Sequence, residues 1–308
     1  MILCSGWGFF GHEKVNRMAV FTLPPEMIGF YKKNLEYITK ASVNPDRRRY
    51  SVKEEAPRHY IDVEDYGDSA LDRLPKYWRD AVILIGEDTL YARGIVPWHI
   101  VTMFHRLRES FQLNSPDEIL RNSAELGHYV ADANVPLHTT SNHNGQQSGQ
   151  IGIHAFWESR LPELFSDQYN FFTGRASYIA DPQQAAWEAV SHAHALLDSV
   201  LNAERLLTAS HGSAKFNYET KGKQTVRVYS IMFSRLYHEQ LANMVERQLC
   251  ASIKLTGDLW YTAWVDAGQP DLNRLIHYRP TEAELKLRQE ELVKWKEKNF
   301  GAREHDED

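Results

Sequence analysis

Two pairs of histidine and carboxylate stand at helical spacing near the middle of the sequence. His128 and Asp132 are four residues apart, and so are His154 and Glu158. Four residues make about one helical turn, so each pair can direct both side chains to one face. A single pair of this kind is more often a salt-bridged histidine than a metal ligand. Two pairs with His138 between them favour a metal site, and imidazole and carboxylate without thiolate suit a catalytic zinc.

The segments that hold these side chains have apolar residues three and four positions apart and little internal proline or glycine, which is typical of helices. Pro136 ends the helix that carries His128, so that His138 can approach the same site from another direction. With no internal repeat and no evident strand pair, the fold class is all-α. The expected helices cover residues 12–23, 26–43, 97–113, 116–134, 154–163, 182–208 and 228–256.

Loops and a final helix complete this prediction. Residues 44–67 contain two prolines and mixed charges and are expected to form an extended loop, and the glycine-rich residues 142–152 a second loop. The capping box of Thr281 and Glu284 opens a last, highly charged helix. The simplest interpretation of its charges is a solvated helix face.

The composition of the chain excludes several classes of protein. The chain has 308 residues and a net charge of −6, with 43% hydrophobic and 25% charged residues, which is typical of a globular protein and excludes a largely disordered one. The acidic balance argues against broad coating of nucleic acid, but not against a local site for phosphate esters. No apolar run approaches the roughly 18 residues of a membrane span. Two cysteines, Cys4 and Cys250, are too few for a disulfide framework.

Four segments in order resemble a known superfamily, that of the S1/P1 nucleases and zinc-dependent phospholipases C. They are Trp7-Gly-Phe-Phe-Gly-His12, the stretch from Arg58-His59-Tyr60 to Asp65, the segment from His128 to His138, and His154 to Glu158. The resemblance covers residues 7 to about 160. It implies a single multi-helix domain with a cleft for three zinc ions.

The resemblance also implies a set of ligands. Asp46 is chosen over Asp62 and Asp65 because its distance of 13 residues before His59 is close to the family's spacing. Asp132 would bridge the first and third ions. The implied ligands are Asp46, His59, His128 and Asp132 for the first zinc, His138, His154 and Glu158 for the second, and His12 and Trp7 for the third.

Trp7 would bind through its α-amine and its carbonyl oxygen, which requires that Trp7 begin the mature chain. We therefore expect residues 1–6 to be the remnant of a signal peptide, residues 7–280 the enzymatic domain, and residues 281–308 a charged helix and tail. The protein is then secreted or periplasmic. A chain that keeps Met1 to Gly6 is expected to bind the third zinc weakly.

The resemblance suggests how the site would act. A hydroxide held at the zinc pair bridged by Asp132 would attack phosphorus, and Arg49 resembles an arginine that contacts the phosphate. Asp62 resembles a carboxylate that receives a nucleobase edge, and Tyr60 could stack on a base. The alternatives are that Arg49 belongs to a solvated basic run with Arg47 and Arg48, and that Tyr60 is simply packed beside His59.

Three functions remain open at this point. Arg49 and Asp62 favour a nuclease that cleaves single-stranded RNA or DNA and also removes 3′-phosphates. Glu158 stands where fungal nucleases carry Asp and bacterial phospholipases carry Glu, which favours a phospholipase C acting on phospholipid head groups. A zinc protein without catalysis is disfavoured, because every ligand has a candidate. We infer no protein partner.

Several other histidines and aromatic residues are not expected to be part of the site. His99 matches no ligand of the family and is expected in the core or behind the ligands, and His143 is expected to be solvated. His192 and His194 lie on different helix faces, so they do not form a ligand pair. Phe156 and Trp157 are expected in the core.

Overall fold

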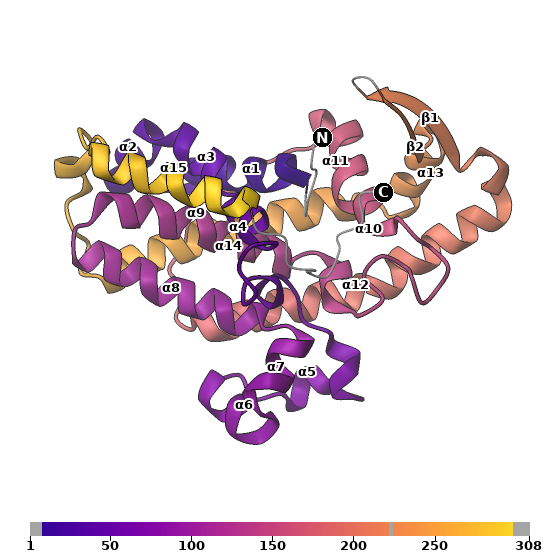
Figure 1. Cartoon of the computed structure of the whole chain (residues 1–308), viewed down its shortest axis with the longest axis horizontal. Helices are drawn as coiled ribbons and strands as arrows, with labels where there is room; N and C mark the ends of the chain where they lie inside the picture. The colour runs from indigo at the N-terminus through magenta and orange to yellow at the C-terminus, as the bar shows by residue number, and fades with distance from the viewer. Residues whose placement is uncertain (1–7, 222–223, 298–308) are drawn as a thin grey trace.

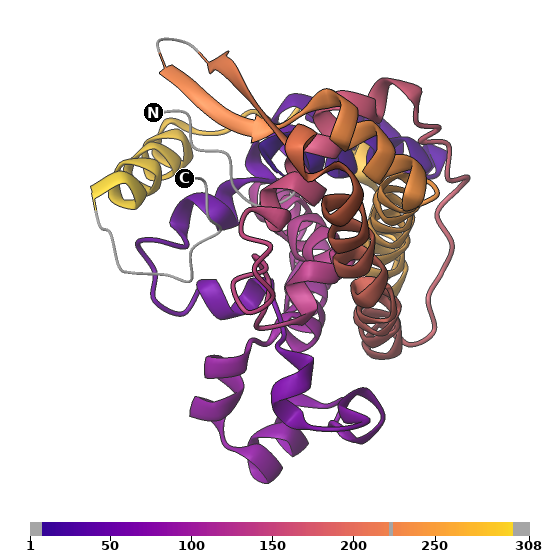
Figure 2. The ribbon, with the colours of Figure 1, turned by 90° about the vertical axis from the view of Figure 1, so that its right-hand side faces the viewer.

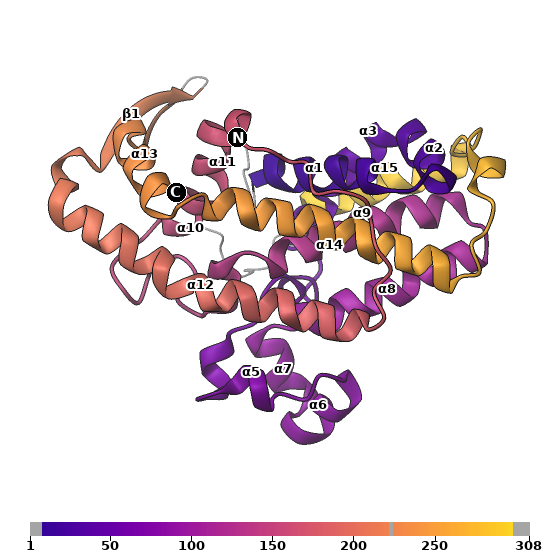
Figure 3. The same cartoon turned by 180° about the vertical axis from the view of Figure 1, so that it is seen from behind.

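A central helix, α9, carries the segment with the strongest metal-ligand pattern and is surrounded by other helices. The computed structural model describes residues 8–221 and 224–297. α9 packs against α1, α3, α8 and α14, and the long helices α12 and α14 run along the back of the molecule (Figure 3). The helices are α1 (Gly8–Ala19), α2 (Pro25–Lys33), α3 (Leu35–Ala41), α4 (Asn44–Arg48), α5 (Ala70–Arg73), α6 (Trp78–Ile85), α7 (Glu87–Arg93), α8 (Val96–Gln112), α9 (Pro116–Ala133), α10 (Ile153–Ala155), α11 (Leu161–Phe165), α12 (Pro182–His211), α13 (Ile231–Gln240), α14 (Met244–Asp266) and α15 (Glu282–Glu297).

Several predicted helices are confirmed with small shifts of their ends. Residues 97–113, 116–134 and 182–208 correspond to α8, α9 and α12. The capping box also forms, because the Thr281 hydroxyl accepts from the backbone N–H of Glu284 while the Glu284 carboxylate accepts from Thr281. α15 follows directly and packs on the body through ion pairs of Arg288 with Asp117 and of Arg121 with Glu291, so its charged face is not wholly solvated.

The prediction of a single helix over 26–43 is wrong. The chain forms α2 and α3 instead, with Asn34 between them at φ −106°, and the Asn34 side-chain amide donates to the carbonyl of Phe30. A side chain that bonds its own preceding turn competes with helix continuation. Residues 44–67 are likewise not one extended loop, because they contain α4 and the 3₁₀ turns Ala56–His59 and Val63–Tyr66.

The expectation that no strands pair is also wrong. Strands β1 (Phe216–Lys221) and β2 (Gln224–Tyr229) form an antiparallel hairpin, with Phe216 opposite Tyr229. The segment is rich in aromatic and β-branched residues, which favour strands over helices, and the Tyr229 ring stacks on Phe156 at 3.7 Å between centroids. The predicted helix over 228–256 is therefore replaced by the end of β2, then α13 and α14.

Two parts of the fold project from the helical body. The hairpin stands at one end, and α5, α6 and α7 form a lobe on another side (Figures 1 and 2). Sequence analysis assigned no elements to the lobe. None of the helices within the described residues combines the length and apolar character needed to cross a bilayer. The expected signal remnant at residues 1–6, Trp7, and the tail from residue 301 lie outside the described residues.

Candidate metal centre

The face of α9 that points toward α1 presents His128 and Asp132 one turn apart. His128 Nε2 lies 3.2 Å from Asp132 Oδ2, and both side chains are fully buried. Helix α1 approaches α9 closely at Gly127, where a Cβ atom would meet the side chain of Asn16. The lack of a side chain at Gly127 thus lets α1 bring His12 against His128, and their rings stack at 3.9 Å.

A first donor group forms where α4 and the turn before Tyr60 meet α9. Asp46 Oδ1 lies 3.7 Å from both His59 Nδ1 and His128 Nε2, and those two nitrogens are 3.0 Å apart. Asp132 Oδ2 is 2.9 Å from His59 Nδ1. The structure therefore brings together the four residues that the resemblance assigned to the first zinc, and it places Asp46 among them.

The segment that carries His59 is held by backbone hydrogen bonds rather than by a long helix. Pro57 and Tyr60 accept from Ile95 and Val96 at 2.7 and 3.2 Å, and Ile61 donates to His138 at 2.9 Å. At Gly94, φ is +86° and a Cβ atom would lie 2.2 Å from the Tyr60 carbonyl oxygen, so only glycine permits this approach.

His12 faces the other oxygens of the same two carboxylates. Its Nε2 is 3.5 Å from Asp132 Oδ1 and 3.8 Å from Asp46 Oδ2. Asp132 thus directs Oδ2 toward the first group and Oδ1 toward His12, which is the arrangement required of a bridging carboxylate. Trp7, the other residue assigned to the third zinc, is not described.

A separate donor group combines His138 with the second helical pair. His138 Nε2 is 3.1 Å from His154 Nε2 and 3.5 Å from Glu158 Oε2, and the latter two atoms are 3.2 Å apart. The His138 Nδ1–H donates to the carbonyl of His59 at 2.7 Å, which directs the Nε2 lone pair toward the group. Glu158 lies within a π-helical turn, Phe156–Arg160, and His154 lies in α10 just before it; such turns are often found at functional sites.

The charges of these residues suit metal binding. Burial, together with the neighbouring His128, lowers the pKa of His12 to about 3, so this imidazole is neutral. Burial opposes ionisation of Glu158, but the adjacent His154 and His138 lower its pKa to about 2. Asp132 is equally buried, and His128 and His138 hold the pKa of this carboxyl well below its usual range. Neutral imidazoles and ionised carboxylates are the ligand forms of zinc. Burial opposes protonation of His128 and His138, but the neighbouring Asp132 raises the pKa of both, so these two imidazoles would release protons when zinc binds.

Unpaired buried atoms provide a test of whether a metal fits. Among the described residues, both ring nitrogens of His12, both carboxylate oxygens of Asp46 and Oδ1 of Asp132 have no hydrogen-bond partner. Such atoms are costly to bury unless something binds them. Two ligands at the usual zinc distance of about 2.0–2.1 Å lie roughly 3.3–3.4 Å apart in a tetrahedral site, close to the separations given above. The donor groups therefore fit zinc.

The three consecutive arginines after Asp46 have different surroundings. Arg47 is exposed, Arg48 is buried in ion pairs with Glu55 and Glu125, and Arg49 is 1% exposed. Arg49 Nη1 lies 3.8 Å from Asp46 Oδ1, and its Nε and Nη1 have no hydrogen-bond partner among the described residues. The alternative of a solvated basic run is therefore wrong for Arg49. Tyr60, the residue after His59, is half-buried, and Asp62 is buried.

Sequence analysis missed one carboxylate beside this centre. Glu55 is fully buried, and its Oε1 lies 3.4 Å from His59 Nε2. Glu55 and His59 are four residues apart, the same spacing that singled out His128 with Asp132. The pair was overlooked because its segment was expected to be an extended loop, in which that spacing brings nothing together.

Most of the residues that were not expected to be ligands have the surroundings that the sequence predicted. His99 is buried and its ring contacts Tyr129, and Phe156 and Trp157 are in the core. His194 bonds the Thr139 hydroxyl at 3.0 Å. His143 differs from expectation, since it is half-buried and its ring lies 5.8 Å from that of His154.

Fold and donor groups together define an all-α protein with buried groups of histidine and carboxylate that could hold metal ions. A model of the S1/P1 nuclease family matches residues 7–255, and the chain belongs to this family. Among solved structures, the alpha-toxin of Clostridium perfringens from an avian strain is similar in fold, with a TM-score of 0.51 and 15% identity. The match covers 85% of this chain and 65% of the toxin chain. No curated protein matches the chain.

Proposed function

We propose that the protein is an extracytoplasmic, zinc-dependent nuclease of S1/P1 type that cleaves single-stranded nucleic acid and removes 3′-phosphates. The family match supports hydrolysis of phosphodiesters. The observation that carries the choice of nuclease is Arg49, a buried guanidinium beside Asp46 that keeps unpaired N–H groups at the donor groups. An arginine in this position can bind two oxygens of a phosphodiester at once.

The roles of the individual residues follow from their positions. Three zinc ions would be held by Asp46, His59, His128 and Asp132, by His138, His154 and Glu158, and by His12 with the α-amine and carbonyl of Trp7. Bound zinc supplies an acidified water and positive charge against the phosphoryl oxygens. Asp132 shares its two oxygens between donor groups and so fixes their separation. Arg49 orients the phosphate and stabilises charge on it.

Specificity for nucleic acid would come from the residues that follow His59. Asp62 accepts hydrogen bonds from a nucleobase edge, and Tyr60 offers its ring for stacking, which contributes about 1–3 kcal/mol per base where it occurs. Both belong to the segment that the backbone bonds of Pro57, Tyr60 and Ile61 hold against its neighbours. Their distance from the donor groups is therefore fixed.

Phospholipase C activity is the second candidate, and Glu158 is the observation that favours it, because bacterial phospholipases carry glutamate at this ligand position. Aspartate and glutamate can both ligate zinc, so an exchange of one for the other preserves the metal site. For this reason Glu158 is weaker evidence about the substrate than Arg49.

The test compares substrates directly. Protein beginning at Trp7 and the full chain are loaded with zinc and given single-stranded RNA, single-stranded DNA and phosphatidylcholine in parallel. We expect chelator-sensitive release of nucleotides, three zinc ions per chain in the first protein, and a weakly held third ion in the second. Asp132→Asn serves as the inactive control and is expected to lose zinc and hydrolysis together. Release of phosphocholine without nucleotides would replace the nuclease by the phospholipase.

A further inference from the structure

We propose that Glu55 is a positioning residue for the metal ligand His59, an inference that rests on the proposed zinc centre. The two ring nitrogens of His59 face opposite partners. Nδ1 lies 2.9 Å from Asp132 Oδ2 and 3.0 Å from His128 Nε2, whereas Nε2 lies 3.4 Å from Glu55 Oε1. The side of the ring away from the donor group therefore meets a carboxylate.

This contact favours one of the two tautomers of the ring once a metal is bound. Both ring nitrogens face a carboxylate, which only accepts hydrogen bonds: Nδ1 faces Asp132 at 2.9 Å and Nε2 faces Glu55 at 3.4 Å. When a metal takes the lone pairs of Nδ1 and Asp132, the ring proton has to lie on Nε2, where Glu55 can accept it. Nδ1 is the nitrogen directed at Asp46, Asp132 and His128. Residues that orient a ligating histidine in this way typically contribute a factor of about 10–100 to metal affinity.

Glu55 is itself held by three residues, which makes its position well defined. Its Oε2 accepts from Arg48 Nε at 2.7 Å and from Arg58 Nη1 at 2.8 Å, and the Tyr129 hydroxyl donates to Oε1. Arg48 in turn pairs with both oxygens of Glu125, at 2.6 and 2.8 Å. Two guanidinium groups and one hydroxyl group thus fix both oxygens of Glu55 beside the ring of His59.

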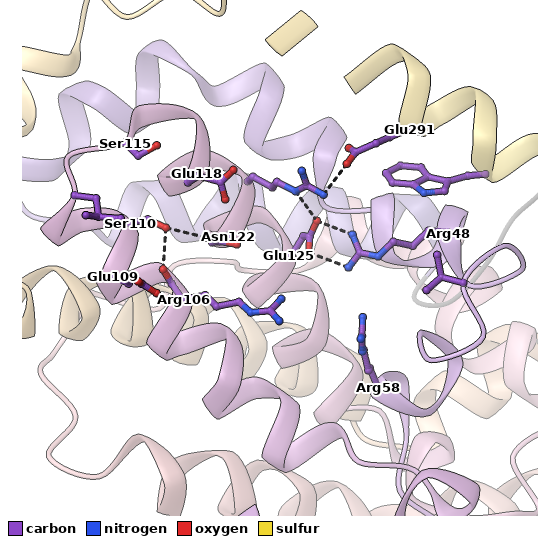
Figure 4. Close-up of a pocket in the computed structure, with 14 residues that line it drawn as sticks. Arg48, Arg58, Arg106, Glu109, Ser110, Ser115, Glu118, Asn122, Glu125 and Glu291 are labelled. Carbon is purple, nitrogen blue, oxygen red and sulfur yellow. Dashed lines mark hydrogen bonds and ion pairs between the residues drawn. The ribbon is translucent and has the colours of Figure 1, made fainter. Parts of the chain in front are cut away.

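The outer side of this network borders a cavity of about 580 Å³ beneath α15. Figure 4 shows Arg48, Arg58 and Glu125 at its wall, with the ion pair of Arg48 and Glu125 drawn, and Glu109 on α8 across the cavity. Glu109 is an exposed glutamate of the same cavity that belongs to none of the donor groups. It therefore offers a matched control for removing one negative charge.

The experiment compares Glu55→Gln, Glu109→Gln and the unchanged full chain. Zinc retained per chain is measured during dialysis against increasing concentrations of a chelator, and thermal unfolding is followed with and without zinc. We expect Glu55→Gln to bind one zinc about 10–100-fold more weakly, whereas Glu109→Gln retains the affinity of the unchanged chain. The increase in Tm produced by zinc should shrink in Glu55→Gln. A purely structural role would lower Tm in both states and leave that increase unchanged.

Tyr129→Phe provides a second variant in case Glu55→Gln does not fold. It removes the hydroxyl that fixes Oε1 while keeping the ring, and a loss of several-fold in zinc affinity is expected. The inference is overturned if the variant that folds binds zinc as tightly as the unchanged chain. It is also overturned if the unchanged chain binds no zinc. An unchanged chain that binds zinc but hydrolyses neither substrate refutes the proposed function alone, because the comparison of affinities still stands.

Discussion

Gly127→Ala tests whether the close approach of α1 to α9 assembles the metal centre. A Cβ atom at residue 127 would lie 1.9 Å from Asn16 Oδ1 and 3.0 Å from Thr256 Cγ2. Asn16 is fully buried and its amide donates to the Ala124 carbonyl at 3.1 Å, so it has no free space into which to move. The helices must separate, or Asn16 must give up this hydrogen bond.

The magnitude follows from these contacts. Overpacking a buried site costs about 1–3 kcal/mol, and losing the bond of Asn16 costs about 1 kcal/mol more. The better helix propensity of alanine offsets about 1 kcal/mol of this cost. We therefore expect a net loss of about 1–3 kcal/mol in the free energy of unfolding. His12 lies one turn before Asn16 on α1, so any separation also moves its ring away from His128.

Urea unfolding of zinc-free protein measures the loss of stability, and metal analysis of the loaded protein measures zinc held near His12. The double variant with Asn16→Ala serves as the control, because it removes the oxygen that the new methyl group meets. We expect the double variant to be more stable than the sum of the two single effects predicts. Simple additivity, or a Gly127→Ala protein as stable as the original, would refute the reasoning.

Two further predictions concern charged groups near the centre. Arg49→Met should lower turnover about 10²–10³-fold, since it removes a donor to the transition state, and metal analysis of the same sample should show that zinc is retained; unchanged turnover would exclude Arg49 from the reaction. The pKa of Glu125 is lowered because its pairing with Arg48 outweighs burial, so its contribution to stability is complete above the usual value of 4.5 and is lost as pH falls through the lowered one. Urea unfolding of zinc-free protein from pH 7 to pH 3 should therefore show a shallower decline for Glu125→Gln, and an equally steep decline would contradict this assignment.

Local geometry explains which parts of the site were predictable from the sequence. His128 with Asp132, and His154 with Glu158, are pairs within one helical turn, so spacing alone places their side chains together. Asp46 required the resemblance, because no local rule connects it to His59. The position of Glu55 depends on the hydroxyl of Tyr129 on α9, which donates to Glu55 and accepts from Arg48. Both contacts join segments over 70 residues apart, which no pattern in one sequence reveals.

Contacts between distant segments, which a sequence pattern does not reveal, also explain errors in the predicted fold. The long helices α8, α9 and α12 have sustained apolar periodicity, and they were predicted closely. The hairpin was missed because Phe156, on which its Tyr229 stacks, lies over 70 residues earlier in the chain. The lobe of α5, α6 and α7 consists of helices of four to eight residues, which are too short for periodicity to identify.

The donor groups also bear on how the chain is held together. Their ligands lie on α1, α4, the turns that contain His59 and His138, α9 and the segment from His154 to Glu158. An ion bound to residues so far apart in sequence closes long loops, as a disulfide does, and the free energy of binding then becomes free energy of folding. Cys250 is the sole cysteine among the described residues and is unpaired. The zinc ions would thus serve as the cross-links of the amino-terminal half, while the helices after residue 158, which supply no donor to these groups, act as its scaffold.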